Sequence, residues 1–584
     1  MSGTPTSEPA APEARLDSWK EIAAYLGRNE RTVRRWEERE GLPVHRLVHE
    51  KRGSVFAYRS ELDQWWNARK VTVEPPAMGK NSETLNSTPK SARYAGSRIW
   101  VLVAAVLLVA VGGALAIRKF RPHSGVENKI RSIVVIPLRN LSPDPGQEYF
   151  SDGATDALIS SLAQIQDLRV ISFTSAMRYK GTTKPLPEIG RELAVDGVVE
   201  GSIQQEGSRV RISAQLIEAS SDRHLWAQVY DRERSDLLKA QAEVARAIAE
   251  EIRGRLTPEE AKRFKPRTVA AAAQEEYLLG HDHVWKMNER DQLEALRHFE
   301  QAVRLQPDYA DAHAQIGGVY LNRAIFTRGI PFHDGEQPAF EALQRALELD
   351  PDLAIGHDLL ADWLLQYKHD WGGAEAQYER AIELNPNSLD ARADHACLLA
   401  ALGRFQDVFA ELDRAVALDP QNSFVEYIYG TFAGLARKYD VAERHFQRAL
   451  ELDPQNFQAQ IGRLRLLTFQ GRFERALALL EQQVKAHGGD LSSNAFAGVL
   501  FAKLGRREEA LHVLAEVTAK NAKTDQGMLA SLYFAIGDLT NGFKTLEHLY
   551  DVSSPIFAAY DPTWDPVRSD PRFKAQLKRL QLPE

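Results

Sequence analysis

The residues best suited to chemistry are six basic side chains near the amino terminus. Four of them are arginines within a stretch of eight residues, and the other two precede a glycine at a predicted turn. A guanidinium group donates hydrogen bonds in a planar fork that fits phosphate oxygens and the guanine edge in the major groove. The pattern therefore predicts contacts with double-stranded DNA. The six residues are Arg28, Arg31, Arg34, Arg35, Lys51 and Arg52.

Charge alone does not decide in favour of DNA, because acidic residues accompany the basic ones. Glu30, Glu37, Glu38 and Glu40 lie on the same predicted helix, and residues 16–70 carry 12 basic and nine acidic side chains, a net charge of +3. Such a helix can also be an ordinary solvated surface. The order of the surrounding elements must carry the inference, and binding of a protein in place of DNA stays open.

Other chemistry-bearing patterns are weak. The sequence has no phosphate-binding glycine loop, no zinc-protease motif and no nucleophilic-serine motif. His281 and His283 suggest a metal-ligand pair, but helical side chains two residues apart point in different directions. Asp152 and Asp156 share a helical face as capping and solvated carboxylates, and Cys397 is a small core residue. We therefore expect no catalytic residue, no metal and no cofactor.

Two short helices joined by a glycine-containing turn position the arginines. Ser18 and Glu21 form a capping box, so a helix is expected over residues 19–27. A second helix is expected over residues 29–40, before the turn at Gly41. This is the arrangement of a helix-turn-helix unit, whose second helix enters the major groove.

The second helix has one apolar face. Val33 and Trp36 lie three residues apart and should pack on Ile22 and Leu26 of the first helix. This packing would turn the four arginines outward.

Two strands and a third helix complete the module. Residues 45–47 and 55–58 are strand candidates around a basic tip at residues 51–53, and Ser60 should cap a helix containing Leu62. This order, with TVRRWEEREGLPVHR at its centre, resembles the winged helix-turn-helix of MerR-like and excisionase-like proteins over residues 16–70. The resemblance implies recognition-helix contacts from Arg31, Thr32, Arg34 and Arg35, and minor-groove or phosphate contacts from Lys51 and Arg52.

A membrane span is expected after this module. Residues 99–117 are 19 residues without a charge, which at 1.5 Å per residue cover about 28 Å, close to the hydrocarbon thickness of a bilayer. Residues 71–98 have the composition of a flexible linker, and residues 1–15 that of a loose tail. Basic residues flank the span on both sides, so the positive-inside rule leaves its orientation open.

A mixed α/β pattern covers residues 130–256. Residues 133–138 form an apolar run typical of a buried strand, and residues 198–205 and 209–217 predict a hairpin with one buried face. The order of segments, from IVVIPLRNLSPDPGQEYFSDGATDALISSLAQI to HLWAQVYDR, resembles the TolB-like domain that precedes repeat arrays in bacterial envelope and signalling proteins. The resemblance implies no catalytic residue. Some such proteins carry a cyclase domain, for which we expect no segment here.

The remainder of the chain repeats itself. Prolines follow predicted helix ends at spacings of 44, 35, 34 and 34 residues, and a small, a large and a small residue stand 12, eight and five positions before each. This register resembles the second helix of a tetratricopeptide repeat. It predicts about eight repeats over residues 276–550, a ten-residue insertion within residues 322–337, and a carboxy-terminal cap over residues 551–584. The prolines are Pro307, Pro351, Pro386, Pro420 and Pro454.

Length and composition agree with several domains. A chain of 584 residues with 44% hydrophobic and 26% charged residues should form three or four domains, and it is neither wholly disordered nor a polytopic membrane protein. The net charge of −7 excludes nucleic-acid binding along the whole chain, and a single cysteine excludes an intramolecular disulfide. The expected fold class is multidomain, with a mostly-α winged helix-turn-helix, one transmembrane helix, an α/β TolB-like domain and an all-α repeat solenoid.

This combination resembles the membrane-integrated transcription regulators of the ToxR and CadC kind. Because DNA is cytosolic, the resemblance implies one span in the bacterial inner membrane, with a cytoplasmic amino terminus and a periplasmic carboxy terminus. A protein or peptide captured by the repeats would change the association of neighbouring chains, which could form a homodimer on DNA. The alternative is an envelope interaction scaffold whose amino-terminal module binds protein.

Overall fold

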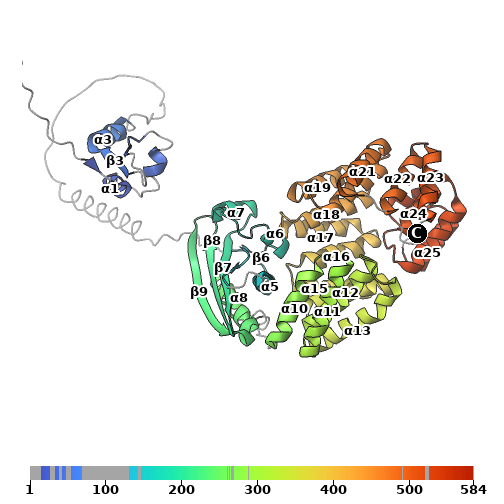
Figure 1. Ribbon diagram of the computed structural model, residues 1–584, viewed down its shortest axis with the longest axis horizontal. Coiled ribbons are helices and arrows are strands. Elements are labelled where there is room, and N and C mark those ends of the chain that lie inside the picture. Colours follow the sequence, from blue (N-terminus) through green and yellow to red (C-terminus); the bar gives the residue numbers. More distant parts are fainter. Residues whose placement is uncertain are drawn as a thin grey trace, which may run out of the picture. The chain divides into compact units, whose positions relative to one another are not determined.

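The chain consists of two units, residues Met1–Arg121 and Pro122–Glu584, seen in the computed structural model of Figure 1. The structure describes residues 15–16, 18–26, 33–37, 42–47, 54–68, 130–142, 147–254, 256–258, 261, 264, 269–286, 288–488, 491–519 and 525–582. The predicted linker over residues 71–98 and the predicted span over residues 99–117 lie outside this part. Within it, the helices are either too short or too polar to cross a membrane.

The first unit contains a three-stranded antiparallel sheet with helices around it. The strand order is β1-β3-β2, and residues 33–37 are helical. The helix α1 starts where the sequence predicts, because the Ser18 hydroxyl accepts a hydrogen bond from the Glu21 amide at 3.3 Å. The other elements are β1 (Arg15–Leu16), α1 (Trp19–Tyr25), β2 (His45–Leu47), β3 (Ser54–Tyr58) and α3 (Arg59–Ala68).

Two predictions about this unit are wrong in detail. Arg15 is not in a loose tail but pairs with Tyr58 in the sheet, because the sheet supplies backbone partners that a local pattern does not reveal. The third helix begins at Arg59, directly after β3, one residue before the cap position predicted at Ser60.

The core of the first unit confirms the expected packing of the helical faces. Val33 and Ile22 are fully buried, and Trp36 and Leu26 pack against the same apolar cluster. Removal of such side chains from water, at about 25 cal/mol per Å² of apolar surface, is the main stabilising contribution in a module this small.

The second unit begins with a six-stranded mixed sheet. Its order is β6-β4-β7-β8-β9, with β5 beside β7. Strands β4, β5 and β6 run parallel to their neighbours, and β7, β8 and β9 form an antiparallel meander that includes the predicted hairpin. The strands are β4 (Ser132–Val135), β5 (Arg139–Asn140), β6 (Arg169–Val170), β7 (Gly197–Glu206), β8 (Arg209–Glu218) and β9 (Arg223–Glu233).

Helices cover this sheet and build one apolar core with it. The helices are α5 (Glu148–Ala163), α6 (Phe173–Met177), α7 (Leu186–Glu192) and α8 (Leu237–Arg253), with a 3₁₀ turn η3 (Arg234–Asp236) before α8. The apolar run over residues 133–138 is not one strand. Regular pairing ends at Val135 and resumes at Arg139, while the Ile136 amide still donates to the Val199 carbonyl at 2.8 Å.

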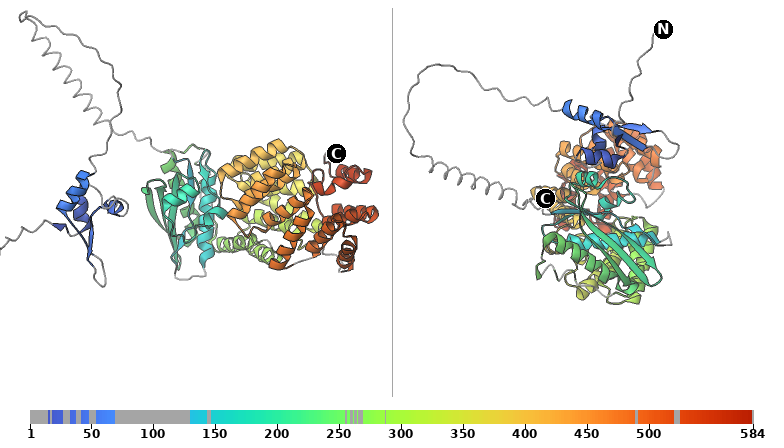
Figure 2. Two further views of the ribbon diagram at one scale, coloured as in Figure 1. Left: turned by 90° about the horizontal axis from the view of Figure 1, so that it is seen from above. Right: turned by 90° about the vertical axis from the view of Figure 1, so that its left-hand side faces the viewer.

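Eight antiparallel helix pairs follow in the described residues between Ala271 and Val552, and Figures 1 and 2 show them as a curved stack. The first begins at Ala271, five residues before the predicted start. The pairs are α10 (Ala271–Val284) with α11 (Glu289–Leu305), α12 (Ala310–Ile325) with α13 (Glu336–Leu349), α14 (Ala354–Trp363) with α15 (Trp371–Leu384), α16 (Leu389–Ala401) with α17 (Phe405–Leu418), α18 (Ser423–Leu435) with α19 (Tyr439–Leu452), α20 (Phe457–Phe469) with α21 (Phe473–His487), α22 (Leu491–Lys503) with α23 (Arg507–Ala519), and α24 (Gln526–Ile536) with α25 (Leu539–Val552).

Four further elements interrupt or follow the pairs. They are the 3₁₀ turn η4 (Phe332–Gly335), the π-helical turn η5 (Leu364–Lys368), the 3₁₀ turn η6 (Pro562–Val567) and α26 (Pro571–Arg579). The turn η4 and the loop before it separate α12 from α13, which is where the 44-residue spacing predicts an insertion.

The small-large-small register of the second helices is confirmed, because its members form the contacts between neighbouring helices. Phe446 of α19, for example, is 2% exposed. Its ring atoms come within 2.7 Å of the position that a Cβ would take on Gly430 and within 2.4 Å of that on Gly462. Because these glycines of the first helices have no side chain, they leave space for the large residue of the second helix. The other large members, Phe299, Leu343, Tyr378 and Leu412, are fully buried.

Candidate interaction surfaces

The predicted DNA-contacting face is partly described. Arg34 and Arg35 are both exposed on the helical residues 33–37, as the helical spacing predicts. The Arg34 guanidinium stands 5.0 Å from the centroid of the Trp19 ring, a cation–π contact that places the side chain against α1. The remaining predicted contacts lie outside the described residues. These are Arg28, Arg31, Thr32, Lys51 and Arg52.

In the second unit, the α/β domain rests on loops of the repeats. Asn387, after α15, donates from Nδ2 to the carbonyls of Ala163 and Leu168 at 2.8 Å each. One repeat later, Asp419 accepts from the Ser172 hydroxyl at 2.6 Å. Asn387 and Asp419 are 9% and 1% exposed. These two inter-repeat loops are therefore occupied by the chain itself, and Figure 2 shows the sheet domain beside the repeats.

The last part of the chain also lies on the repeats. We call residues 553–582 the terminal segment. Its Phe557 ring packs on Phe432 of α18, with ring centroids 5.6 Å apart, and its Tyr560 ring packs on Phe405 of α17 at 5.3 Å. The apolar side chains of η6 and α26 share a core with α14, α15 and α16.

Ion pairs fix the terminal segment at further repeats. Arg465 of α20 lies 2.6 Å from a carboxylate oxygen of Asp561, and Arg437, between α18 and α19, lies 2.7 Å from Asp565. Successive repeats thus contact one irregular segment. An array of helix pairs presents an extended surface of this kind to a ligand. In this protein the terminal segment occupies part of that surface.

A group of four aspartates lies on two neighbouring first helices. Each helix carries two of them one turn apart, so they share a face. Loss of solvent raises the pKa of the carboxyl groups of Asp358, Asp362 and Asp394, and for Asp362 it raises the pKa to about 6. Asp362 accepts a hydrogen bond from the Tyr378 hydroxyl at 2.6 Å, and Asp358 is 5% exposed with one oxygen lacking a hydrogen-bond partner. The four are Asp358 and Asp362 on α14, and Asp390 and Asp394 on α16.

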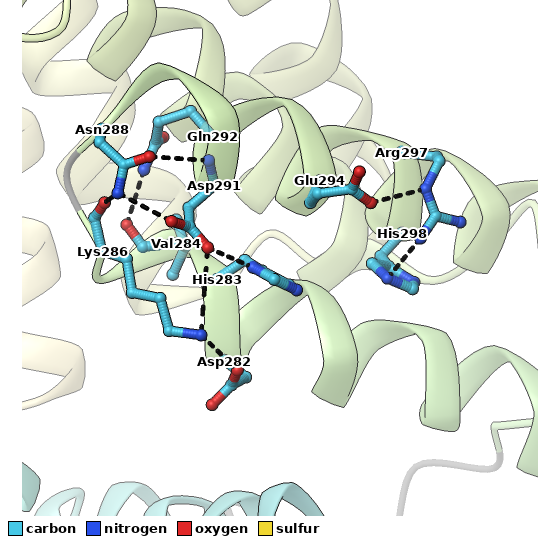
Figure 3. A network of polar contacts seen from close by, with 10 residues as sticks. All are labelled: Asp282, His283, Val284, Lys286, Asn288, Asp291, Gln292, Glu294, Arg297 and His298. Atoms are coloured by element: carbon cyan, nitrogen blue, oxygen red, sulfur yellow. Dashed lines mark hydrogen bonds and ion pairs between the residues drawn. The ribbon is translucent and has the colours of Figure 1, made fainter.

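The histidines of the first repeat are paired with separate carboxylates. His281 Nε2 lies 3.3 Å from Asp156, and His283 Nδ1 lies 2.6 Å from Asp291. Figure 3 shows His283 in a polar network in which Asn288 caps α11 by accepting from the Asp291 amide at 3.1 Å. Among the described residues, no group of three or more His, Cys, Asp or Glu side chains is arranged to hold a metal ion.

Asp152 and Asp156 are less solvated than the sequence suggests. Asp152 forms a double contact with the Lys180 ammonium at 2.7 and 2.8 Å, and burial raises its pKa. Asp156 joins α5 to α10 through His281. Cys397 packs beside the apolar cluster of α16 and α18, in agreement with a small core residue.

The sequence interpretation missed two features of this surface. The aspartates at i and i+4 in α14 and α16 are visible in the sequence, but their mutual proximity depends on the stacking of two repeats. The terminal segment has a signal in Trp564 and Phe573, which are too apolar for a solvated end and are 6% and 0% exposed.

Two segments match models of the tetratricopeptide repeat, over residues 363–423 and 435–495. The repeats predicted from the sequence are therefore confirmed, and they indicate a protein–protein interaction scaffold. The winged-helix and TolB-like resemblances stay predictions.

One curated relative is the protein named "Putative adenylate cyclase 3" of Rhizobium meliloti (strain 1021), which is 34% identical over 231 residues. The match covers 39% of this chain and 39% of the relative. The chain thus aligns with about two fifths of the length of that protein.

Solved structures with a similar fold include a tetratricopeptide repeat protein of Parabacteroides merdae (16% identity, 45% of this chain and 98% of that one, TM-score 0.35). Others are PilF of Pseudomonas aeruginosa (20% identity, 36% and 91%, TM-score 0.29) and a thermophilic repeat protein of Thermus thermophilus (18% identity, 34% and 100%, TM-score 0.30).

Proposed function

We propose that the chain is a DNA-binding transcription regulator anchored in the bacterial inner membrane by one span, whose repeats bind a protein or peptide partner in the periplasm. The observation that carries DNA binding is the pair of exposed arginines, Arg34 and Arg35, on a helix whose opposite face is locked into the core by Val33. The repeats support the protein-binding part. The proposed role includes neither catalysis nor a cofactor.

The terminal segment bears on how a partner binds. It already covers part of the surface of α17, α18 and α20, through Tyr560, Phe557 and Asp561. A partner that uses the same surface must displace this segment, whereas a partner that binds elsewhere leaves it in place. Displacement of the segment, or binding beside it, would reach the amino-terminal module as a change in the association of neighbouring chains. The predicted flexible linker would set the effective concentration of that module and would not fix its orientation.

DNA binding is tested with the full chain in detergent, by measuring affinity for genomic fragments. Arg35→Ala should weaken specific binding by about 1–3 kcal/mol and relax the sequence preference, because a bidentate base contact is lost. Lys51→Ala should weaken binding to all sequences alike and flatten the salt dependence. Lys20→Ala, exposed on α1, is the control. Full specific affinity in a variant with Arg31, Arg34 and Arg35 all replaced by alanine would refute the assignment.

The membrane arrangement is tested with a reporter that is active only in the periplasm. A fusion after Leu256 should be active and a fusion after Lys70 inactive. The reverse pattern would contradict a regulator with a cytoplasmic amino terminus.

A second candidate function is an envelope interaction scaffold whose amino-terminal module binds protein. The stacking of Arg34 on Trp19 favours it, since a guanidinium held against an aromatic ring also suits a protein interface. Absence of any DNA binding by the intact protein, together with co-purification of a specific protein through residues 16–70, would favour the scaffold.

A further inference from the structure

The outer edge of the six-stranded sheet is available for pairing with another strand, a property that does not depend on DNA binding. Strand β9, 11 residues long, ends the strand order β6-β4-β7-β8-β9, and Figure 1 shows it as the outermost strand. In the part of the chain that the structure describes, no strand pairs with its outer side. A long edge of unpaired amides and carbonyls is a template for another strand.

Part of β9 lacks the usual protection of an edge. Natural edge strands carry charges, proline or β-bulges where pairing must be prevented. A bulge interrupts the pairing of β9 with β8 at Leu225, but residues 226–230, beyond it, pair regularly and contain neither a charge nor a proline. Val229 is 58% exposed in the middle of this stretch. The charged residues stand at the two ends of the strand, with Arg223 at the beginning and Glu233 at the end.

The stretch is self-complementary when two copies run antiparallel about Gln228. Trp226 of one copy then lies opposite Tyr230 of the other, and Ala227 lies opposite Val229. Since side chains alternate between the faces of a strand, the two Ala227 and two Val229 side chains gather on one face, and the aromatic rings lie on the other. An isologous two-fold interface requires this reciprocity.

We propose that a second copy of this chain pairs with the outer edge of β9 in antiparallel register centred on Gln228, so that two six-stranded sheets become one continuous sheet. The main-chain hydrogen bonds supply the attraction, and the exposed Ala227 and Val229 pairs supply the register, while Trp226 and Tyr230 face the core of their own copy. The interface would bring two copies of the second unit together without involving the repeats or the terminal segment.

Disulfide cross-linking of the full-length protein tests the register. Cysteine replaces Gln228 in a Cys397→Ala background, which removes the one natural thiol. In the proposed register the two Cys side chains are directly opposite, with Cα atoms about 4.5–5.5 Å apart, a separation that a disulfide spans. Ala227→Cys is the matched control, since residue 227 lies opposite residue 229, and the Cα atoms of the two copies of residue 227 are then diagonal neighbours at about 7–8 Å or more, beyond the reach of an unstrained disulfide. Mild oxidation should link most of the Gln228→Cys protein as a dimer and little of the Ala227→Cys protein.

Sedimentation of the full chain in detergent, at concentrations from about 1 to 100 μM as suits a small interface, tests the energetics. Val229→Lys should raise the dimer dissociation constant at least about tenfold, because it places two charges in the shared apolar group. Val229→Thr keeps a β-branched side chain and should change the dimer dissociation constant less than Val229→Lys does. Thermal unfolding of both variants, at a concentration at which the parent is monomeric, should match the parent, since Val229 is 58% exposed in one copy. A monomeric parent, a Val229→Lys dimer as tight as the parent dimer, or equal cross-linking at 227 and 228 would overturn the proposal, as would cross-linking of Gln228→Cys to a different protein.

Discussion

At the scale of single residues, the aspartates of α14 and α16 link the stability of the repeats to pH. Asp362 receives a hydrogen bond from Tyr378. Its charge adds to the effect of burial in raising the pKa of Asp358 and of Asp394. The pKa of Asp362, raised by burial to about 6 from an ordinary 3.8, means that the folded protein binds this proton more tightly than the unfolded chain. Stability attributable to this group therefore rises as the pH falls from 7 through about 6, and this gain is complete near pH 4.

Asp362→Asn should stabilise the protein at pH 7.5 by about 1–3 kcal/mol, because it removes a buried negative charge while the amide oxygen can still accept from Tyr378. At pH 5 the gain should be much smaller, since the native carboxyl group is then largely protonated. Melting temperatures of the parent and the variant at the two pH values measure the difference. Asp440→Asn, at an exposed position of α19, is the control. A gain of the same size at both pH values would contradict the proposed ionisation.

At the scale of elements, each helix pair is held together by one large side chain of the second helix, which packs against a small residue of the first helix. Phe446 of α19 fills the space left by Gly430 of α18 and Gly462 of α20, and it thereby joins two repeats. In a repeat array each pair contacts only its neighbours, so the energetic effect of a core change stays local.

Phe446→Ala should reduce the local stability of α18, α19 and α20 by about 3–5 kcal/mol, because a buried ring is replaced by a cavity. Hydrogen exchange of backbone amides should rise in these helices and stay unchanged in α10 and α11. Phe424→Ala is the matched control, since Phe424 is 42% exposed at the start of α18. Uniform loss of protection along the whole array would show that the repeats unfold as one cooperative block.

At the scale of the whole second unit, the array closes on itself through its own end. His333, after α12, donates from Nε2 to the Asp551 carbonyl at 2.9 Å, and Arg328 lies 3.0 Å from Asp525. The second repeat thus meets the eighth, and the terminal segment bridges the repeats between them. The interaction scaffold therefore presents a surface that is already partly filled.

Arg465→Ala should loosen the terminal segment, because the Asp561 side chain, 13% exposed, loses its charged partner. Trypsin should then cleave at Arg572 or Lys574 several-fold faster than in the parent protein. Arg463→Ala is the control, because Arg463 on the same helix pairs with Glu443 of α19 and does not touch the terminal segment. Equal cleavage rates in both variants would mean that the apolar contacts alone retain the segment.

The sequence by itself determined the elements whose signals are local. The Ser18 cap, the hairpin of β7 and β8 and the buried register of the second helices follow from short spacings, where backbone geometry dictates which side chains share a face. The insertion after α12 follows from the one proline spacing that is longer than the repeat. The resemblances supplied the expected roles of the basic residues in the same way, from an ordered string of local patterns.

Only the tertiary structure decided what depends on residues far apart in the chain. Asn387 contacts the loop before β6 across more than 200 positions, and Asp561 meets Arg465, because repeats stack and curve by amounts that no local spacing encodes. For the same reason the charge of Asp390 raises the pKa of Asp358 on the neighbouring repeat. The same holds for the exposed edge of β9. A strand's sequence gives its two faces, but whether its edge is paired depends on how many strands the sheet contains and where the chain adds them.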